Sequence, residues 1–237
     1  MLPARATGPV EMQAADGAGA QAQVLPGSGA PVRPIGGWSK RALDLVVASC
    51  ALLAAAPIML VVALIIRCTA GGPVFYSHRR IGFDGRPFYC HKFRTMARDA
   101  DRALQDYLER NPEAAREWEE NRKLAHDPRI TLLGTMLRKS SIDELPQLLN
   151  ILRGDMSCVG PRPIVADELE LYGACARDYL SVRPGLTGLW QVTGRSRTDY
   201  DSRVFLDSHY VRNWSISSDL IILARTVIAV MRFDDAA

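Results

Sequence analysis

Two adjacent carboxylates surrounded by cations form the stretch of this 237-residue chain with the clearest chemical potential. Asp143 and Glu144 stand at the predicted start of a short apolar helix, and further charges crowd both ends of the stretch: Arg138, Lys139, Arg153, Asp155 and Arg162. Gly160-Pro161-Arg162-Pro163 predicts a stiff turn, because proline fixes its own φ and limits its neighbours. A helix that only packs into a core needs none of these charges. The stretch therefore indicates an anion-binding site.

A structural alternative stays open for the two carboxylates. Ser141 followed three residues later by Glu144 matches a capping box. Acidic residues in a first helical turn are also favoured by the helix dipole, by roughly 0.3 to 1 kcal/mol. The turn around Arg162 favours the anion site over this alternative, since a purely structural turn does not need an arginine.

The same residues resemble the signature of a known family, the bacterial sugar transferases. The likeness rests on Ser141-Ile142-Asp143-Glu144-Leu145-Pro146-Gln147-Leu148, Asn150, Gly154-Asp155-Met156-Ser157 and Val159-Gly160-Pro161-Arg162-Pro163. It extends from about Lys40 to about Arg232 and includes Lys92-Phe93-Arg94-Thr95-Met96 and Asp127-Pro128-Arg129-Ile130-Thr131. These enzymes are monotopic polyprenyl-phosphate glycosyl-1-phosphate transferases, which move a phosphosugar from a nucleotide diphosphate sugar to a lipid phosphate.

The resemblance implies an enzyme of the type that primes exopolysaccharide synthesis with a hexose-1-phosphate. It implies that Asp143 attacks the donor, forms an aspartyl-phosphosugar and releases UMP, after which undecaprenyl phosphate attacks that intermediate. Glu144 would bind the metal or assist proton transfer, and Asp143 is a second candidate ligand. The region after Trp190 is most similar to members that use galactose or glucose, and UDP-galactose is the donor we expect.

Cations are required by this chemistry. When a carboxylate approaches a diphosphate, each pair of negative charges at about 4 Å repels by on the order of 4 kcal/mol at an effective dielectric near 20. Mg²⁺ suits a site of Asp and Glu that has no His or Cys cluster. Arginine can also bind phosphate in bidentate fashion. The candidate substrate-binding residues are Lys92, Arg94, Arg138, Arg162, Arg183, Gln191 and Arg195. No GxGxxG or GxxxxGK[ST] motif occurs that would explain nucleotide binding instead.

The uncharged stretch Leu45–Ile66 predicts a membrane element. It has about 22 residues, and a helix of that length reaches roughly 30 Å, enough to cross a bilayer. Pro57 near its middle would bend the helix, and basic residues flank both ends, whereas a spanning helix favours one side. A re-entrant helix that leaves through the leaflet it entered satisfies both observations. The family resemblance implies the same, so we favour it over the spanning alternative.

The remaining pattern predicts a mostly helical α+β protein. Residues 1–38 are expected to be a disordered tail, 39–68 the re-entrant helix, and 69–237 a cytoplasmic catalytic domain. Within that domain the sequence predicts a small β-hairpin (Val74–Ser77 and Pro87–Phe93), catalytic helices, a helix over Val165–Val182, a loop and strand over Arg183–Arg195, and a helix over Asp199–Asn213. Leu220–Met231 is too short to span and predicts either an amphipathic helix at the membrane interface or a core helix. Arg225 and Arg232, which suit anionic headgroups, favour the interfacial helix.

Composition limits the class of protein further. The chain is 48% hydrophobic and 23% charged with a formal net charge of +3, and no basic, aromatic-interleaved face indicates a nucleic-acid partner. Its five scattered cysteines indicate neither a disulfide framework nor a zinc site, which favours a reducing, cytoplasmic setting. The family resemblance implies a place at the bacterial inner membrane, with the catalytic domain facing the cytoplasm. A homodimer is left open. Two alternative functions also remain at this point: a non-enzymatic membrane anchor of a polysaccharide-export complex, and a metal-dependent phosphatase.

Overall fold

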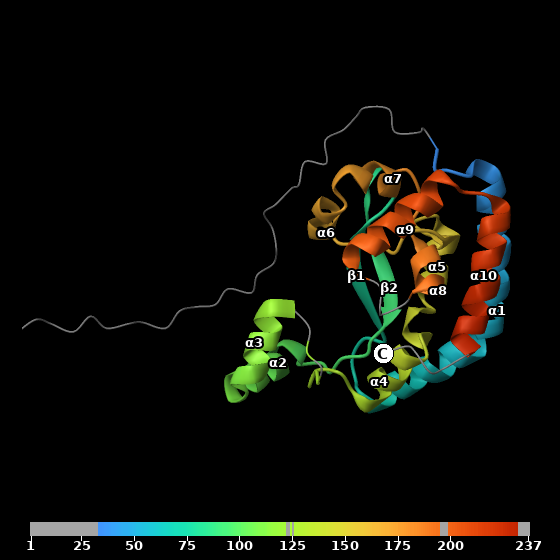
Figure 1. Cartoon of the computed structure of the whole chain (residues 1–237). Coiled ribbons are helices and arrows are strands. Elements are labelled where there is room, and N and C mark those ends of the chain that lie inside the picture. The colour runs from blue at the N-terminus through green and yellow to red at the C-terminus, as the bar shows by residue number, and fades with distance from the viewer. Residues whose placement is uncertain (1–32, 122–123, 125, 195–198, 232–237) are drawn as a thin grey trace, which may run out of the picture.

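The computed structural model describes residues 33–121, 124, 126–194 and 199–231, and within them it confirms a mostly helical α+β fold (Figure 1). The predicted tail lies largely outside the described residues. The helices are α1 (Gly37–Thr69), α2 (Ala100–Arg110), α3 (Pro112–Asn121), α4 (Leu132–Lys139), α5 (Gln147–Arg153), α6 (Ala166–Leu171), α7 (Ala176–Leu180), α8 (Leu189–Thr193), α9 (Tyr200–Arg212) and α10 (Ile216–Met231). The strands are β1 (Phe75–Ile81), β2 (Pro87–Phe93), β3 (Ser157–Val159) and β4 (Gly185–Thr187).

The predicted hairpin is present and its first strand is longer than expected. β1 pairs antiparallel with β2 from Phe75 opposite Phe93 to Ile81 opposite Pro87. Asp84 and Gly85 turn the chain with φ values of 57° and 71°, a left-handed conformation that Asp and Gly tolerate. The second sheet is a short parallel pair, β3 with β4.

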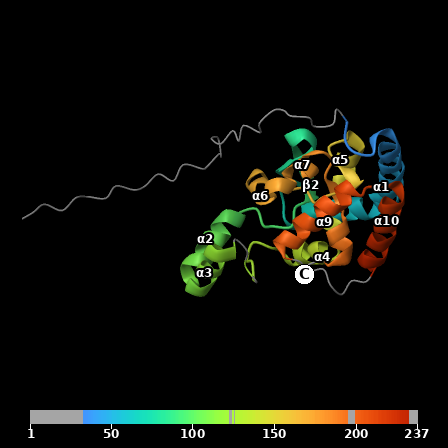
Figure 2. The same ribbon diagram turned by 45° about the horizontal axis from the view of Figure 1, so that its top comes forward.

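Helix α1 stays helical through Pro57 for 33 residues. Figures 1 and 2 both show that it changes direction, so that its blue first part runs beside α10 and its cyan second part turns towards α4. A proline inside a helix removes one backbone hydrogen bond and bends the axis. The helix begins two residues before the predicted boundary and ends one residue after it.

Both ends of α1 are attached to the same body. Near its start, Arg41 donates to the carbonyl oxygens of Ile151 and Leu152 at the end of α5, at 2.6 and 2.9 Å. Near its end, Val62 and Ile66 are buried against Phe93 and Leu137. The long apolar middle of the helix, in contrast, is largely exposed, with the side chains Leu53, Ile58, Leu60, Val61 and Leu64 all more than half exposed.

Helix α10 packs beside α1 through a buried polar network. Lys40 Nζ lies 2.7 Å from Asp219 Oδ2, and the Tyr210 hydroxyl and Trp214 Nε1 donate to the same carboxylate at 2.6 and 3.1 Å. The outer side of α10 is apolar and exposed at Leu220, Ile221, Val227 and Ile228. The place of this helix at the membrane interface stays a prediction. The helix starts four residues earlier than predicted.

Two predicted elements are wrong in detail. The single helix expected over Val165–Val182 is two helices, α6 and α7, because Gly173 adopts a left-handed φ of 50° and a 3-10 turn (Gly173–Cys175) separates them. The loop and strand expected over Arg183–Arg195 are the strand β4 followed by the helix α8. Asn111 separates α2 from α3, which begins at Pro112, and these two helices form an arm that stands apart from the body in Figures 1 and 2.

Candidate active site

The two carboxylates lie in a tight turn between α4 and α5. Ser141 has a left-handed φ of 57°, and Ile142–Glu144 form a single 3-10 turn before Pro146 leads into α5. The Ser141 side chain makes no capping hydrogen bond, so the capping-box alternative is wrong. A turn of this kind projects consecutive side chains in different directions, which allows Asp143 and Glu144 to have different surroundings.

Glu144 is held by two cations that come from distant parts of the chain. Lys92 Nζ on β2 donates to Glu144 Oε1 at 2.6 Å, and Arg162 Nη2 lies 3.5 Å from the same oxygen. Burial alone would raise the pKa of the Glu144 carboxyl, but the positive charges of Lys92 and Arg162 outweigh it and hold this pKa below its usual range. Glu144 is therefore an ionised carboxylate whose negative charge is offset by Lys92 and Arg162.

Asp143 has the opposite environment. Its side chain is 8% exposed, and within the described residues no hydrogen bond to its carboxylate is present. Burial raises its pKa to about 6, and the neighbouring negative charge of Glu144 acts in the same direction. Lys92, Arg138 and Arg162 act against the rise without cancelling it. The result is a carboxylate that is mostly ionised at neutral pH and that no donor among the described residues engages.

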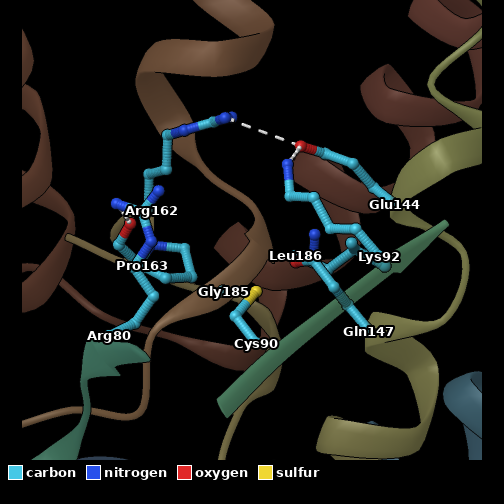
Figure 3. Close-up of a pocket in the computed structure, with 9 residues that line it drawn as sticks. All are labelled: Arg80, Cys90, Lys92, Glu144, Gln147, Arg162, Pro163, Gly185 and Leu186. Carbon is cyan, nitrogen blue, oxygen red and sulfur yellow. Dashed lines mark hydrogen bonds and ion pairs between the residues drawn. The ribbon is translucent and has the colours of Figure 1, made fainter. Parts of the chain in front are cut away.

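A pocket opens beside Glu144, and Figure 3 shows its lining. Arg80 and Arg162 stand on one side, and Lys92 and Glu144 face them from the other. Sequence reasoning named Lys92, Glu144 and Arg162 but missed the rest of the wall: Arg80, Cys90, Gln147, Pro163, Gly185 and Leu186. The signal for Arg80 and Cys90 lies in the hairpin register, which places both on the pocket side of the sheet.

The loop that carries Arg162 is placed by contacts between glycines. Gly160 directly follows β3, two residues before Arg162, and Gly185 begins the neighbouring strand β4. A Cβ on Gly185 would collide with the Gly160 amide, and a Cβ on Gly160 would sit 2.7 Å from the Arg183 carbonyl oxygen. Two strands can approach this closely only without side chains, so the glycines bring Arg162 and the β4 wall into one pocket.

Comparison with known proteins decides the family. A family model described as bacterial sugar transferase matches residues 35–233, which is most of the chain. The chain belongs to the bacterial sugar transferase family. This transferase is 52% identical over 219 residues to Exopolysaccharide production protein ExoY of Sinorhizobium fredii, covering 92% of this chain and 97% of the relative. The resemblance read from the sequence motifs is confirmed.

Two further relatives are longer proteins with names that refer to galactose. The transferase is 49% identical over 198 residues to Undecaprenyl-phosphate galactose phosphotransferase of Salmonella typhimurium, covering 83% of this chain and 41% of that protein. It is 45% identical over 197 residues to UDP-galactose-lipid carrier transferase of Erwinia amylovora, again covering 83% of this chain and 41% of that protein.

Several predicted substrate-binding residues of the transferase lie outside the pocket lining. Arg94 donates through Nη2 to the carbonyl oxygens of Ala70 and Gly71, which holds the turn after α1. Arg183 donates to the Gly154 carbonyl oxygen at 2.7 Å, at the far end of α5. Both guanidinium groups thus have backbone partners that sequence spacing does not reveal.

The remaining predicted residues are close to the site without lining it, or undescribed. Arg138 donates to the Thr95 hydroxyl at 3.0 Å. It lies close enough to Asp143 for its positive charge to act against the rise in the pKa of that carboxyl. Gln191 donates weakly to the Leu186 carbonyl oxygen behind the pocket wall, at 3.5 Å, and its buried Oε1 has no partner in the described residues. Arg195 lies outside the described residues.

The transferase offers a limited donor set for the expected Mg²⁺. Among the described residues, no group of three or more His, Cys, Asp or Glu side chains could hold a metal ion. Mg²⁺, however, is commonly held by one or two carboxylates together with substrate phosphates and waters. Asp143 has no hydrogen-bonding partner in the described residues, and both contacts of Glu144 use Oε1 and leave Oε2 open. These two carboxylates fit such a site only if the substrate completes it.

Proposed function

We propose that this transferase moves a hexose-1-phosphate from a UDP-sugar to undecaprenyl phosphate, releases UMP and thereby starts exopolysaccharide synthesis. One observation carries the proposal, and it concerns Asp143, a buried carboxylate with no hydrogen-bonding donor in the described residues. Asp143 is not itself part of the pocket lining, but it directly precedes the lining residue Glu144 and is close enough to Lys92 and Arg162 for their charges to act on its pKa. A nucleophile next to a cationic pocket fits a diphosphate substrate. The names of the relatives from Salmonella and Erwinia support the lipid acceptor and a galactose donor.

Asp143 is the nucleophile of the pair. Glu144 forms an ion pair with Lys92 at 2.6 Å, which lowers its nucleophilicity, whereas Asp143 is desolvated and accepts no hydrogen bond from the part of the chain that the structure describes. In the first step an oxygen of Asp143 forms a bond to the sugar-bearing phosphorus. The bond from that phosphorus to the bridging oxygen breaks, and the electron pair leaves with UMP.

The second step returns the enzyme to its starting state. An oxygen of undecaprenyl phosphate attacks the phosphorus of the aspartyl-phosphosugar, and the Asp143–phosphorus bond breaks. The product is a sugar diphosphate lipid, and the Asp143 carboxylate is regenerated. Because the phosphate of the acceptor is anionic too, Lys92 and Arg162 serve both steps by offsetting negative charge at the reacting phosphorus.

Mg²⁺ belongs to this proposal as a cofactor. Asp143 and the open Oε2 of Glu144 are the groups that would hold it, together with oxygens of the diphosphate. When bound, the ion would offset the part of the phosphate charge that the arginines and the lysine leave uncompensated.

The geometry of α1 supports a re-entrant attachment to the bacterial inner membrane with the catalytic domain in the cytoplasm. Within the described residues α1 is the one helix long and apolar enough to cross a membrane. A straight helix of 33 residues would separate its ends by about 50 Å. Arg41 and Ile66, near its two ends, instead contact the same domain, and the axis bends between them (Figures 1 and 2). Both ends therefore belong on one side of the bilayer.

The test is a reconstituted assay. Purified protein in nanodiscs is supplied with Mg²⁺, undecaprenyl phosphate and a panel of UDP-sugars, and both UMP and lipid-linked sugar are measured. The proposal requires UMP release that matches lipid product, with UDP-galactose as the preferred donor. Release of inorganic phosphate without lipid product would favour a phosphatase, and absence of turnover from folded protein would favour a membrane anchor.

A further inference from the structure

Arg80 stands in the pocket with its charge only weakly engaged. Its Nη1 donates to the Pro163 carbonyl oxygen at 3.3 Å and lies 3.5 Å from a carboxylate oxygen of Glu168. Both contacts are long, and both use Nη1. The same Glu168 oxygen already accepts the Val165 amide at 3.0 Å. Lys92, by comparison, makes a short contact with Glu144 at 2.6 Å. Within the described part of the chain, the Nε and Nη2 groups of Arg80 have no hydrogen-bonding partner, so Arg80 has donors available for a ligand.

The position of Arg80 differs from that of Arg162. Arg162 reaches to within 3.5 Å of Glu144, next to the proposed nucleophile. In Figure 3 Arg80 rises from β1 on the same side of the pocket as Arg162, below the Arg162 guanidinium and beside Pro163. If the sugar-bearing phosphorus lies beside Glu144 and Arg162, the part of the pocket lined by Arg80 is left for the second phosphate.

A buried tyrosine joins the two arginine-bearing segments. The Tyr179 hydroxyl donates to the Ile81 carbonyl oxygen at 2.6 Å and accepts the Ile164 amide at 3.2 Å. Ile81 directly follows Arg80, and Ile164 follows Arg162-Pro163. The two segments also pair with each other, since the Ile81 amide donates to the Ile164 carbonyl oxygen at 2.9 Å. Tyr179 is 2% exposed, so these bonds have no competition from water.

We propose that Arg80 binds the phosphate of the departing nucleotide, and that Tyr179 is the positioning residue that keeps Arg80 and Arg162 on one wall. This inference rests on the proposed function. As the bond to the sugar-bearing phosphorus breaks, the leaving phosphate gains negative charge, and a guanidinium can meet two of its oxygens at once. Released UMP carries that same phosphate, so Arg80 also contributes to product binding.

The chain supplies a matched control for Arg80. Arg79 is the preceding residue of β1, and its exposed side chain points to the opposite face of the sheet because strand residues alternate. Arg79→Gln removes the same charge from the same strand without touching the pocket. Arg80→Lys keeps the charge and removes the two-oxygen geometry.

The experiment measures UMP binding by calorimetry on the full-length protein in nanodiscs, alongside turnover of UDP-galactose. Arg80→Gln should weaken UMP binding by roughly 10- to 100-fold, the usual effect of losing a charged hydrogen bond, and should lower kcat. Arg80→Lys should fall between it and the wild type, and Arg79→Gln should match the wild type. UMP binding by Arg80→Gln that equals that of Arg79→Gln would overturn the assignment.

Tyr179→Phe tests the positioning role. It keeps the ring and removes the hydroxyl that bridges Ile81 and Ile164. Its control is Tyr172→Phe, because Tyr172 is buried in the same cluster but its hydroxyl donates to Asp207 on α9. At a temperature well below both unfolding midpoints, only Tyr179→Phe should weaken UMP binding, by several-fold. Equal effects of the two variants would show that the hydroxyl serves stability alone.

Different results would overturn the proposed function and the role of Arg80. A wild-type protein that binds UMP but forms no lipid-linked sugar from any UDP-sugar would overturn the proposed function. A wild-type protein that forms the lipid product, with an Arg80→Gln variant equal to it in UMP affinity and kcat, would overturn the role of Arg80 alone.

Discussion

The 2.6 Å contact between Lys92 Nζ and Glu144 Oε1 separates two neighbouring carboxylates into different chemical states. Glu144 is ionised and neutralised, whereas Asp143, one residue earlier, is buried without a hydrogen-bonding donor in the described residues and has its pKa raised to about 6. Pairs of acids whose environments push their pKa values apart are typical of active sites, where each takes a separate role.

The pH dependence of the first step should follow Asp143. Only the ionised carboxylate is a nucleophile, so single-turnover UMP release should fall as the pH is lowered through about 6. Glu144→Gln removes a negative neighbour and should move this acid limb to lower pH. Lys92→Gln removes a positive neighbour and should move it to higher pH. Rapid-quench measurements without lipid acceptor provide the profiles, and shifts of the same sign in both variants would contradict the assignment.

Asp143→Asn should stabilise the protein at neutral pH while abolishing transfer. The folded-state pKa of about 6 lies above the ordinary 3.8, so the folded state binds the Asp143 proton more tightly than the unfolded state does. Ionisation of Asp143 therefore destabilises the folded protein. This destabilisation is complete above about pH 6 and absent below pH 3.8. The gain at pH 7.5 should be on the order of 1 to 3 kcal/mol and should vanish near pH 3.5.

Thermal unfolding of wild type and variant at several pH values measures this difference. Glu144→Gln is the control, since its carboxyl pKa is lowered rather than raised, and it should lower the midpoint at neutral pH. An Asp143→Asn protein that is no more stable than wild type at pH 7.5 would show that the ionised carboxylate does not destabilise the fold.

The buried pair Lys40–Asp219 should be essential for holding α10 against α1. Lys40→Met leaves the Asp219 carboxylate, 1% exposed, without its counter-charge, and removing one member of a buried pair costs about 3 to 5 kcal/mol. Arg86→Met, which breaks an exposed pair with Asp84 at 3.7 Å, should cost less than about 1 kcal/mol. Denaturant unfolding of Lys40→Met, Asp219→Asn and the double variant should show a double cost well below the sum. Additive costs would mean that the two charges do not interact.

The topology of α1 is testable by cysteine labelling. Cys50 and Cys68, the exposed native cysteines of this helix, are first replaced by serine, and Ser39→Cys is introduced at its exposed start. A re-entrant helix keeps position 39 in the cytoplasm, so a membrane-impermeant maleimide should react only after the cells are permeabilised. Labelling in intact spheroplasts would instead identify a spanning helix.

The motif residues of the site were predictable because they lie within two short sequence motifs of the family. Asp143, Glu144 and Arg162 stand within one stretch of sequence, and Lys92 within another, and the structure brings all four together. Arg80 was missed because the pair Arg79-Arg80 does not reveal which of the two faces the pocket. That choice depends on the hairpin register with β2, and β1 is longer than its apolar pattern indicates.

Long-range backbone contacts explain the predicted residues that lie elsewhere. Arg94 alternates correctly with Lys92 along the chain, but the strand ends at Phe93, and carbonyl oxygens after α1 engage its guanidinium. Arg183 likewise serves the carbonyl end of α5. Local sequence does not show whether an arginine contacts backbone carbonyl oxygens or a phosphate, so these contacts could not be predicted. The part of Arg94 and Arg183 in substrate binding stays a prediction.

The most direct test of the account is covalent capture of the sugar phosphate on Asp143. Protein is incubated with Mg²⁺ and UDP-galactose labelled at the sugar-bearing phosphate, without lipid, then denatured and digested. The account predicts label on the peptide that contains Asp143, none in Asp143→Asn, and transfer of the label to undecaprenyl phosphate when lipid is added before quenching. Lipid product formed at the normal rate by Asp143→Asn, or label on another residue, would contradict it.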